Sequence, residues 1–239
     1  MPRASAIEAM VFAVYIPPQA PSPGQIARSI RPRSSSDIFP ALQAPAANDE
    51  LALADVRAFS IDDSSTTEID DALSVQGLGS GTVTLGIHIA APGLAVHPGS
   101  AIDLLGRARL STVYMPGYKL TMLPDEVVQS YTLQEGRNCP ALSLYVTLDE
   151  STLAISQSVT RLEMVPIASN LRHDKLDTVF TEAFFEDAVA AGAPAADVAW
   201  GPELSFFHRL ARSLKAQRVV VRGKPENFNR PDYNFELDK

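Results

Sequence analysis

The sequence predicts an α+β (mixed α/β) fold, in which a mixed sheet is flanked by helices. Strand-like segments with alternating apolar residues come first, and helix-like segments with apolar residues three to four positions apart follow them. This order, strands and then helices, is typical of α+β domains. The 239 residues, 46% of them hydrophobic, can build one large domain or two small ones.

The strand predictions follow from short apolar or alternating segments separated by polar turns. The alternation is clearest over Thr82–Ala90, after a glycine-rich turn. Two further segments in the second half of the chain are expected to pair across a short polar turn. The five predicted strands are Val56–Ile61, Ile69–Val75, Thr82–Ala90, Ala141–Asp149 and Leu153–Val165.

Three helices are predicted, over residues 100–113, 176–191 and 203–221. Ser100 is a candidate N-cap for the first, because its hydroxyl can accept from a backbone N–H of the first turn. Gly106 weakens that helix. The third helix has apolar residues at helical spacing, namely Leu204, Phe207, Leu210, Ala211 and Leu214. Residues 233–239 (YNFELDK) are predicted to form another strand.

Residues 1–52 are predicted to be a proline-rich leader or linker, followed by the folded region 53–239. The apolar stretch at residues 9–16 is too short to span a membrane and lacks the basic start of a signal peptide. Cys139 is the single cysteine, so no intrachain disulfide or cysteine zinc site is possible, and it is expected to be an inert core residue. We therefore expect a cytoplasmic protein without membrane partners.

The chain is acidic: 20 Lys and Arg residues against 28 Asp and Glu residues give a net charge of −8. A protein that coats nucleic acid non-specifically needs a basic surface, so this balance argues against that class. It does not exclude an enzyme that confines RNA to a local basic channel.

An acidic run lies between two strand-like segments and holds five carboxylates within ten residues: Asp62, Asp63, Glu68, Asp70 and Asp71. Carboxylates gathered in this way repel one another and raise each other's pKa unless a positive charge lies among them. Mg²⁺ takes oxygen ligands and would supply that charge. A solvent-exposed acidic turn is the other interpretation of this run.

The spacing of the acidic run sets two geometric limits. Asp70 and Asp71 are adjacent, so they can face one site only at the start of a strand or at a bulge. An EF-hand calcium loop is excluded, because counting from Asp63 puts Glu68 at position six, where Gly is needed, and Ser74 at position twelve, where Glu is needed.

Five sequence blocks occur in a fixed order: D-x5-E-x-D-D-A-L, HIAAPG, RLSTVYMPG, MLP and R-x-x-PALSL. Together they resemble the ribonuclease II (RNB) family of exoribonucleases over roughly residues 56–239. The resemblance implies that residues 53–239 are the N-terminal portion of an RNB catalytic domain. It also implies metal-dependent 3′→5′ hydrolysis of single-stranded RNA to nucleoside 5′-monophosphates.

The resemblance assigns the acidic residues of the run as catalytic metal ligands. Asp62, Glu68, Asp70 and Asp71 would hold two Mg²⁺ or Mn²⁺ ions, and Asp63 falls between ligand positions. Glu68 stands where the family has Asp, and its extra methylene displaces the carboxylate by about 1 Å. Ala91 follows HIA where family members commonly have Asp.

Three residues are candidate RNA contacts by the same resemblance. Tyr114 matches a position where the family stacks an aromatic ring on the 3′-terminal base. His173 matches a place near the substrate ribose where relatives carry Tyr, and Arg109 could meet phosphate. Ordinary packing for Tyr114, and a surface position for His173 and Arg109, are the alternatives. His88, in an alternating strand, is expected to be structural.

The family also has an Arg and a Glu near the scissile phosphate, well downstream, and no segment of this sequence matches them. We therefore expect an incomplete RNB catalytic domain. The alternative function is a non-catalytic RNA-binding or regulatory fragment of the same fold. The expected protein partners are the remainder of the catalytic domain or a second copy of the chain.

Overall fold

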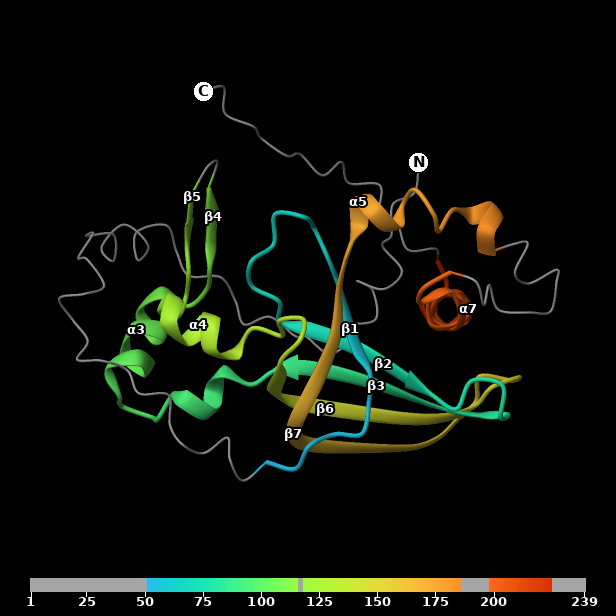
Figure 1. Cartoon of the computed structure of the whole chain (residues 1–239), viewed down its shortest axis with the longest axis horizontal. Helices are drawn as coiled ribbons and strands as arrows, with labels where there is room; N and C mark the ends of the chain where they lie inside the picture. Colours follow the sequence, from blue (N-terminus) through green and yellow to red (C-terminus); the bar gives the residue numbers. More distant parts are fainter. Residues whose placement is uncertain (1–50, 116–117, 186–197, 225–239) are drawn as a thin grey trace, which may run out of the picture.

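The computed structural model describes residues 51–115, 118–185 and 198–224 (Figure 1). The strands are β1 (Ala58–Asp62), β2 (Asp71–Gln76), β3 (Thr82–Ala90), β4 (Val113–Met115), β5 (Tyr118–Leu120), β6 (Asn138–Asp149) and β7 (Ile155–Arg172). The helices are η4 (Pro92–Ala95), α3 (Ala101–Arg109), α4 (Asp125–Tyr131), α5 (His173–Leu176) and α7 (Gly201–Arg222).

The main sheet closes into a barrel in the order β1-β2-β3-β6-β7. Four of its pairings, β1–β2, β2–β3, β3–β6 and β6–β7, are antiparallel, and the closing pairing between β1 and β7 is parallel. The predicted α+β class with a mixed sheet is therefore confirmed. The closure into a barrel was not predicted, because it depends on pairing between the first and last strands.

The chain between β3 and β6 forms a separate group of elements at one end of the barrel, on the left in Figure 1. Helices α3 and α4 pack around a small apolar cluster of Ile102, Val127 and Tyr131, and β4 pairs with β5 as a hairpin. The Ser100 hydroxyl accepts a hydrogen bond from the Asp103 N–H at 3.3 Å, which confirms the predicted N-cap.

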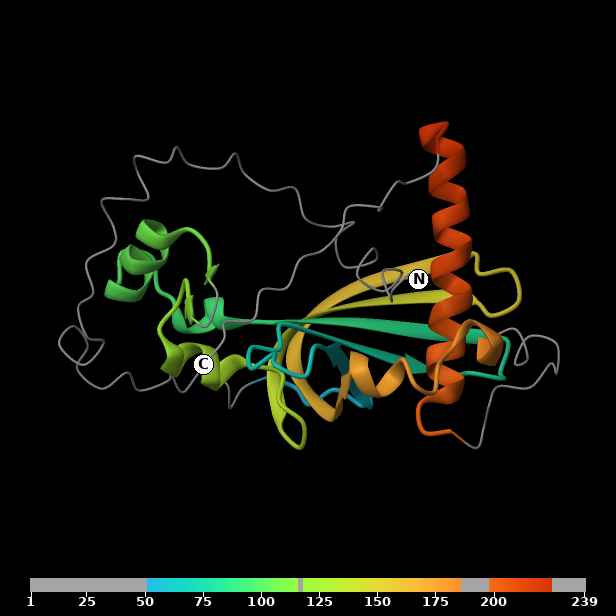
Figure 2. The same ribbon diagram turned by 90° about the horizontal axis from the view of Figure 1, so that it is seen from above.

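Helix α7 covers one face of the barrel strands and runs on beyond them (Figure 2). The predicted apolar face of α7 packs against the apolar side chains of the barrel strands that point toward the helix. Phe207 meets Phe59 of β1 edge-on, with ring centroids 6.0 Å apart, and Trp200 packs on Phe59 at 4.6 Å. The buried members of this cluster are Phe59, Leu73, Val83, Leu85, Leu148, Leu204, Phe206, Phe207 and Leu210.

The helix predicted over residues 176–191 is wrong for its first part. Helix α5 already ends at Leu176, residues 177–181 are not helical, and a new helical turn begins after Thr181. The chain turns here because Phe180 packs into the cluster beneath α7, and the Thr181 hydroxyl accepts from the Phe184 N–H at the start of the new turn. Residues 186–191 lie outside the described part.

Pairing with the barrel begins before β1, since Leu53 forms a parallel bridge with Met164 of β7. The predicted leader over residues 1–52 lies almost entirely outside the described residues, and so does the predicted strand at residues 233–239. Cys139 is buried, as expected of a core thiol. Among the helices that the structure describes, none is long and apolar enough to cross a membrane.

A buried polar network crosses β2, β3 and β6 on the strand face opposite to α7. His88 is fully buried, and its ring nitrogens hydrogen-bond to the Ser74 and Ser143 hydroxyls at 2.9 and 2.8 Å. Next to it, Tyr145 donates to the buried Glu163 carboxylate at 2.6 Å. His88 therefore has the structural role expected from the sequence, because both ring nitrogens are paired inside the protein.

Burial of the neutral imidazole makes part of the stability depend on pH. Desolvation lowers the pKa of His88 from 6.5 to about 4, against an opposing effect of Glu163. Between these two values the unfolded chain binds the proton and the folded chain does not, so acid favours unfolding. Because of this proton uptake at His88 in the unfolded chain, we expect the unfolding free energy to fall by about 3 kcal/mol as the pH falls from 6.5 to 4.

Chemical denaturation of the wild type and of His88→Asn across this range measures that effect. Asn takes up no proton in this range, so the unfolding free energy of the variant should fall less steeply from pH 6.5 to 4 than that of the wild type, and the difference between the two proteins should shrink toward low pH. Parallel profiles for the two proteins would contradict the assignment. The comparison cancels the acidic groups elsewhere, which titrate in both proteins.

Candidate active site

The acidic run forms a loop at the end of the barrel where both β1 and β7 finish. We call residues 63–70 the acidic loop; Asp62 ends β1 before it, and Asp71 starts β2 after it. The loop runs between the β4–β5 hairpin on one side and the end of β7 with α5 on the other (Figure 1). Elements far apart in the sequence thus meet around the carboxylates.

Three anchors fix the acidic loop to the barrel. Arg172, the last residue of β7, donates to the carbonyls of Asp63 and Thr66 at 2.8 and 3.3 Å. Ile69 is buried, its N–H donates to the Thr132 hydroxyl at 2.8 Å, and its carbonyl accepts from the Leu133 N–H at 2.9 Å. The Ser64 hydroxyl donates to the Asp174 carboxylate. The loop backbone is therefore held from both sides.

Asp62 lies beside Arg172 across the parallel β1–β7 pairing. The Ser60 hydroxyl donates to its Oδ2 at 2.6 Å and itself accepts from the Asn170 side-chain amide at 2.9 Å. Burial raises the pKa of the Asp62 carboxyl, although the Ser60 bond and the charges of Arg172 and His173 act to lower it. The carboxylate is thus oriented by a chain of polar groups in a partly desolvated place.

Asp70 and Asp71 lie at the start of β2, the position at which adjacent carboxylates can share a site. The carbonyl of Asp70 accepts from the Ala90 N–H of β3 at 2.8 Å, and Asp71 is the first residue of the strand. Asp70 keeps an exposed surface, yet desolvation raises the pKa of its carboxyl, and the negative charges of Glu68 and Asp62 raise it further. These carboxylates therefore repel one another.

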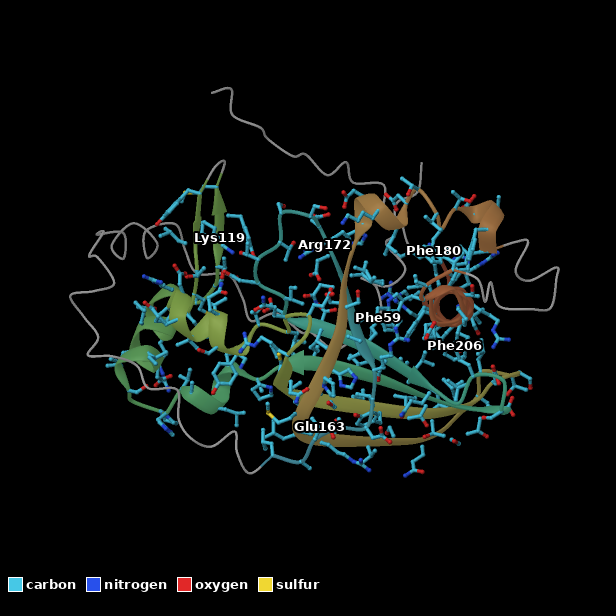
Figure 3. All side chains as sticks on the ribbon, in the orientation of Figure 1. Phe59, Lys119, Glu163, Arg172, Phe180 and Phe206 are labelled. Atoms are coloured by element: carbon cyan, nitrogen blue, oxygen red, sulfur yellow. The ribbon has the colours of Figure 1, made fainter. Side chains whose placement is uncertain are left out.

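Glu68 pairs with a lysine from the hairpin, which the sequence did not suggest. The Lys119 ammonium, on β5, lies 2.7 Å from Glu68 Oε1 and donates to the Thr67 hydroxyl at 2.9 Å. Figure 3 shows Lys119 on the hairpin and Arg172 on the opposite side of the acidic loop. Lys119 also lies close enough to Asp70 to act against the rise in that carboxyl's pKa.

The residue types of this site fit a hard divalent cation. Carboxylate oxygens are the donors that Mg²⁺ prefers, and Glu68 and Asp62 each lie within electrostatic reach of Asp70. In the part of the chain that the structure describes, no group of three or more His, Cys, Asp or Glu side chains is already arranged to hold an ion. Side-chain rotation would be needed to gather the oxygens around a metal.

The candidate RNA contacts lie around the acidic loop but differ in exposure. Tyr114 is 74% exposed on β4, so ordinary core packing does not describe it. His173 starts α5 and lies close enough to Asp62 to influence its pKa. Arg109, at the end of α3, donates to the Thr121 carbonyl at 2.7 Å and so ties α3 to the chain after the hairpin.

Sequence reasoning missed Lys119, Arg172 and Asn170 as parts of the site. Arg172 stands directly before His173, and its place after a long predicted strand was a weak signal of a strand-end position. Lys119 gave no signal, because nothing in its neighbourhood showed that the hairpin folds against the acidic loop. Asn170 accepts from the Glu135 N–H at 2.7 Å and donates to the Leu133 carbonyl at 2.9 Å, so its role is to join distant segments.

Comparison with known proteins gives one family and several relatives. The family described as "RNB domain" matches residues 51–239. Exoribonuclease 2 of Edwardsiella piscicida is 30% identical over 183 residues, which cover 74% of this chain and 26% of that protein.

Two solved structures share the fold. The structure of yeast Ssd1, described as a pseudonuclease, superposes with a TM-score of 0.58 at 25% identity, covering 80% of this chain and 22% of Ssd1. RNase R of Mycoplasma genitalium, solved with ribose-methylated single-stranded RNA, superposes with a TM-score of 0.55 at 14% identity, covering 83% of this chain and 29% of that protein. The chain therefore spans less than a third of each of these relatives.

Proposed function

Because the chain belongs to the RNB domain family of exoribonucleases, we propose that it supplies the metal-binding side of a 3′→5′ exoribonuclease site. The gathering of Asp62, Glu68, Asp70 and Asp71 at one end of the barrel carries this proposal. The negative charges of Glu68 and Asp62 raise the pKa of the Asp70 carboxyl, and carboxylates that repel one another favour a divalent cation. The proposed substrate is single-stranded RNA, and the proposed products are nucleoside 5′-monophosphates.

The four carboxylates would hold Mg²⁺ or Mn²⁺, and the chemistry that two such ions would supply is activation of a water and neutralisation of charge on the leaving oxygen in phosphodiester hydrolysis. Ser60 would keep the Asp62 carboxylate turned toward the site, since it already donates to Oδ2. Arg172 would hold the acidic loop in register by its bonds to the loop carbonyls. The work of the protein here would be to place these carboxylate oxygens.

Around that centre, three side chains would bind RNA. Tyr114 would stack on a base near the 3′ end, which suits an enzyme indifferent to sequence. His173 would donate a hydrogen bond to a ribose 2′-OH, the group that distinguishes RNA from DNA. Arg109 would meet a phosphate with guanidinium donors not used on Thr121. The proposed compartment is the cytoplasm, in keeping with a single buried thiol.

A second candidate function is RNA binding without turnover. The similarity to yeast Ssd1, which is described as a pseudonuclease, favours it. So do two departures from the family pattern, Glu68 at a position of Asp and Ala91 at another position of Asp. This function would use the same surface, with Tyr114 and His173 as contacts and the acidic loop without catalytic ions.

A labelled-RNA assay separates the two functions. Single-stranded RNA labelled at its 5′ end is incubated with the chain and Mg²⁺, with Mn²⁺, or with a chelator, and the products are resolved at nucleotide resolution. Stepwise shortening from the 3′ end that requires the metal supports the exoribonuclease. Salt-sensitive RNA binding without shortening at any metal concentration supports the second function.

We expect Tyr114→Ala to weaken binding of single-stranded RNA by about 1–3 kcal/mol, because one base loses its stacking partner. Fluorescence anisotropy with a labelled oligonucleotide measures the change. Tyr118→Ala is the matched control: Tyr118 is also exposed on the hairpin but pairs with Met115, on the other face from Tyr114. Equal losses for the two variants would argue against a specific stacking site at Tyr114.

A further inference from the structure

Lys119 joins the hairpin to the acidic loop at the residue that departs from the family pattern. Its ammonium lies 2.7 Å from Glu68 Oε1 and 2.9 Å from the Thr67 hydroxyl. The Glu68 side chain is 14% exposed and that of Lys119 is 35% exposed, so water screens the pair less than an open surface pair. Lys119 therefore already provides one positive charge among the carboxylates.

We propose that Lys119 is a tethered cation that holds Glu68 until RNA draws it away, so that RNA binding and metal binding strengthen each other. This inference rests on the proposed function of the site and adds a positioning residue to it. It concerns the order and strength of binding, and no step of hydrolysis depends on it.

Repulsion between positive charges supports the claim that Lys119 limits the use of Glu68 by a metal ion. A divalent ion that uses a Glu68 oxygen would bring two positive charges next to the Lys119 ammonium, and like charges at such distances repel strongly where screening is weak. The ion can use Glu68 fully when the ammonium leaves. Lysine is suited to leave, because its charge sits on a flexible four-carbon stem and its donors rotate freely.

The hairpin geometry supports the claim that bound RNA draws Lys119 away from Glu68. Lys119 lies directly opposite Tyr114 in the β4–β5 pairing, so the two side chains share one face of the hairpin. Cross-strand neighbours of this kind have Cβ atoms about 5 Å apart. A nucleotide stacked on the exposed Tyr114 would therefore bring a phosphate within reach of the ammonium. The phosphate would compete with Glu68 for Lys119. An ion pair between Lys119 and the phosphate would leave the Glu68 carboxylate available to the metal.

This coupling has to be reciprocal. If RNA increases the affinity for metal by a given factor, metal increases the affinity for RNA by the same factor. Removing the ammonium should uncouple the two events, since Glu68 would then be available whether or not RNA is bound. Metal affinity without RNA should rise to the level that the wild type reaches only with RNA.

Titration calorimetry with Mn²⁺, with and without a 2′-O-methylated single-stranded oligonucleotide that resists cleavage, tests the inference. For the wild type we expect the oligonucleotide to tighten Mn²⁺ binding about fivefold or more. For Lys119→Met we expect tightening of similar size without the oligonucleotide, and a change of less than about twofold on adding it. Lys215→Met, an exposed lysine on α7, removes the same charge elsewhere and should behave as the wild type.

Lys119→Gln provides a second variant that keeps a donor for Thr67, and Lys119→Arg, which keeps the charge, should retain the coupling. If Mn²⁺ and RNA bind the wild type independently, or if Lys119→Met and Lys119→Gln leave Mn²⁺ affinity unchanged, the inference is overturned while the proposed function stands. If neither the wild type nor these variants bind Mn²⁺ with RNA present, the proposed metal site itself is overturned, and the inference with it.

Discussion

Replacing Asp71 by Asn is expected to lower the rate of Mg²⁺-dependent RNA hydrolysis by about 1000-fold while leaving the fold intact. Metal ions supply several kcal/mol of transition-state stabilisation, and each 1.36 kcal/mol is a factor of ten in rate. Asn keeps the size of the side chain at the start of β2 but removes the negative charge that the ion needs. Single-turnover degradation of a 5′-labelled oligonucleotide measures the effect.

The matched control for that variant is Asp63→Asn, in the same loop. Asp63 is exposed, and the atom that the barrel uses is its backbone carbonyl, which accepts from Arg172. The control should retain hydrolysis within about threefold, well inside one decade of rate. Unchanged hydrolysis in Asp71→Asn would refute its assignment as a ligand, and equal losses in both variants would point to overall charge instead.

Replacing Phe207 by Ala is expected to destabilise the protein by about 3–5 kcal/mol. Phe207 lies on α7 and is 1% exposed, and its ring packs edge-on against the ring of Phe59 of β1. The truncation removes apolar contact and leaves a cavity that the rigid barrel wall cannot fill. Denaturant unfolding followed by circular dichroism gives the loss as a shift of the midpoint with an unchanged slope.

Val221→Ala is the control for the packing of α7. Val221 lies on the same helix but is 87% exposed, so its truncation should change the unfolding free energy by about 0.5 kcal/mol or less. A loss of under about 1 kcal/mol for Phe207→Ala would mean that α7 does not contribute to the core as described.

Individual strands and helices such as β3 and α3 were predictable because the patterns that specify them lie within a few neighbouring residues. The alternation over residues 82–90 fixed the bounds of β3, and the Ser100 hydroxyl marked the start of α3. The helix over residues 176–191 failed because the burial of Phe180 overrides the spacing of its neighbours. Helical spacing alone cannot show that one apolar residue belongs to a core formed by other elements.

The identity of the candidate ligands came from the ordered blocks, and the strand start at Asp71 agrees with the geometric limit set for adjacent carboxylates. The cations around them were not predictable. Lys119 reaches Glu68 from 51 positions later in the chain, and Arg172 reaches Asp63 from 109 positions later. Such contacts depend on barrel closure and on the position of a short hairpin, and neither leaves a pattern in the neighbouring sequence.

The parallel pairing of β1 with β7 also sets the order in which this molecule can assemble. The two strands are joined by about a hundred residues, and closing so long a loop costs entropy before any contact rewards it. The hairpins β2–β3 and β6–β7 can form from near neighbours, but the acidic loop gains its Arg172 anchor after the last barrel strand is in place. During synthesis the carboxylates of the acidic loop are made before β7, so the loop can gain its Arg172 anchor only after that strand has been added to the chain.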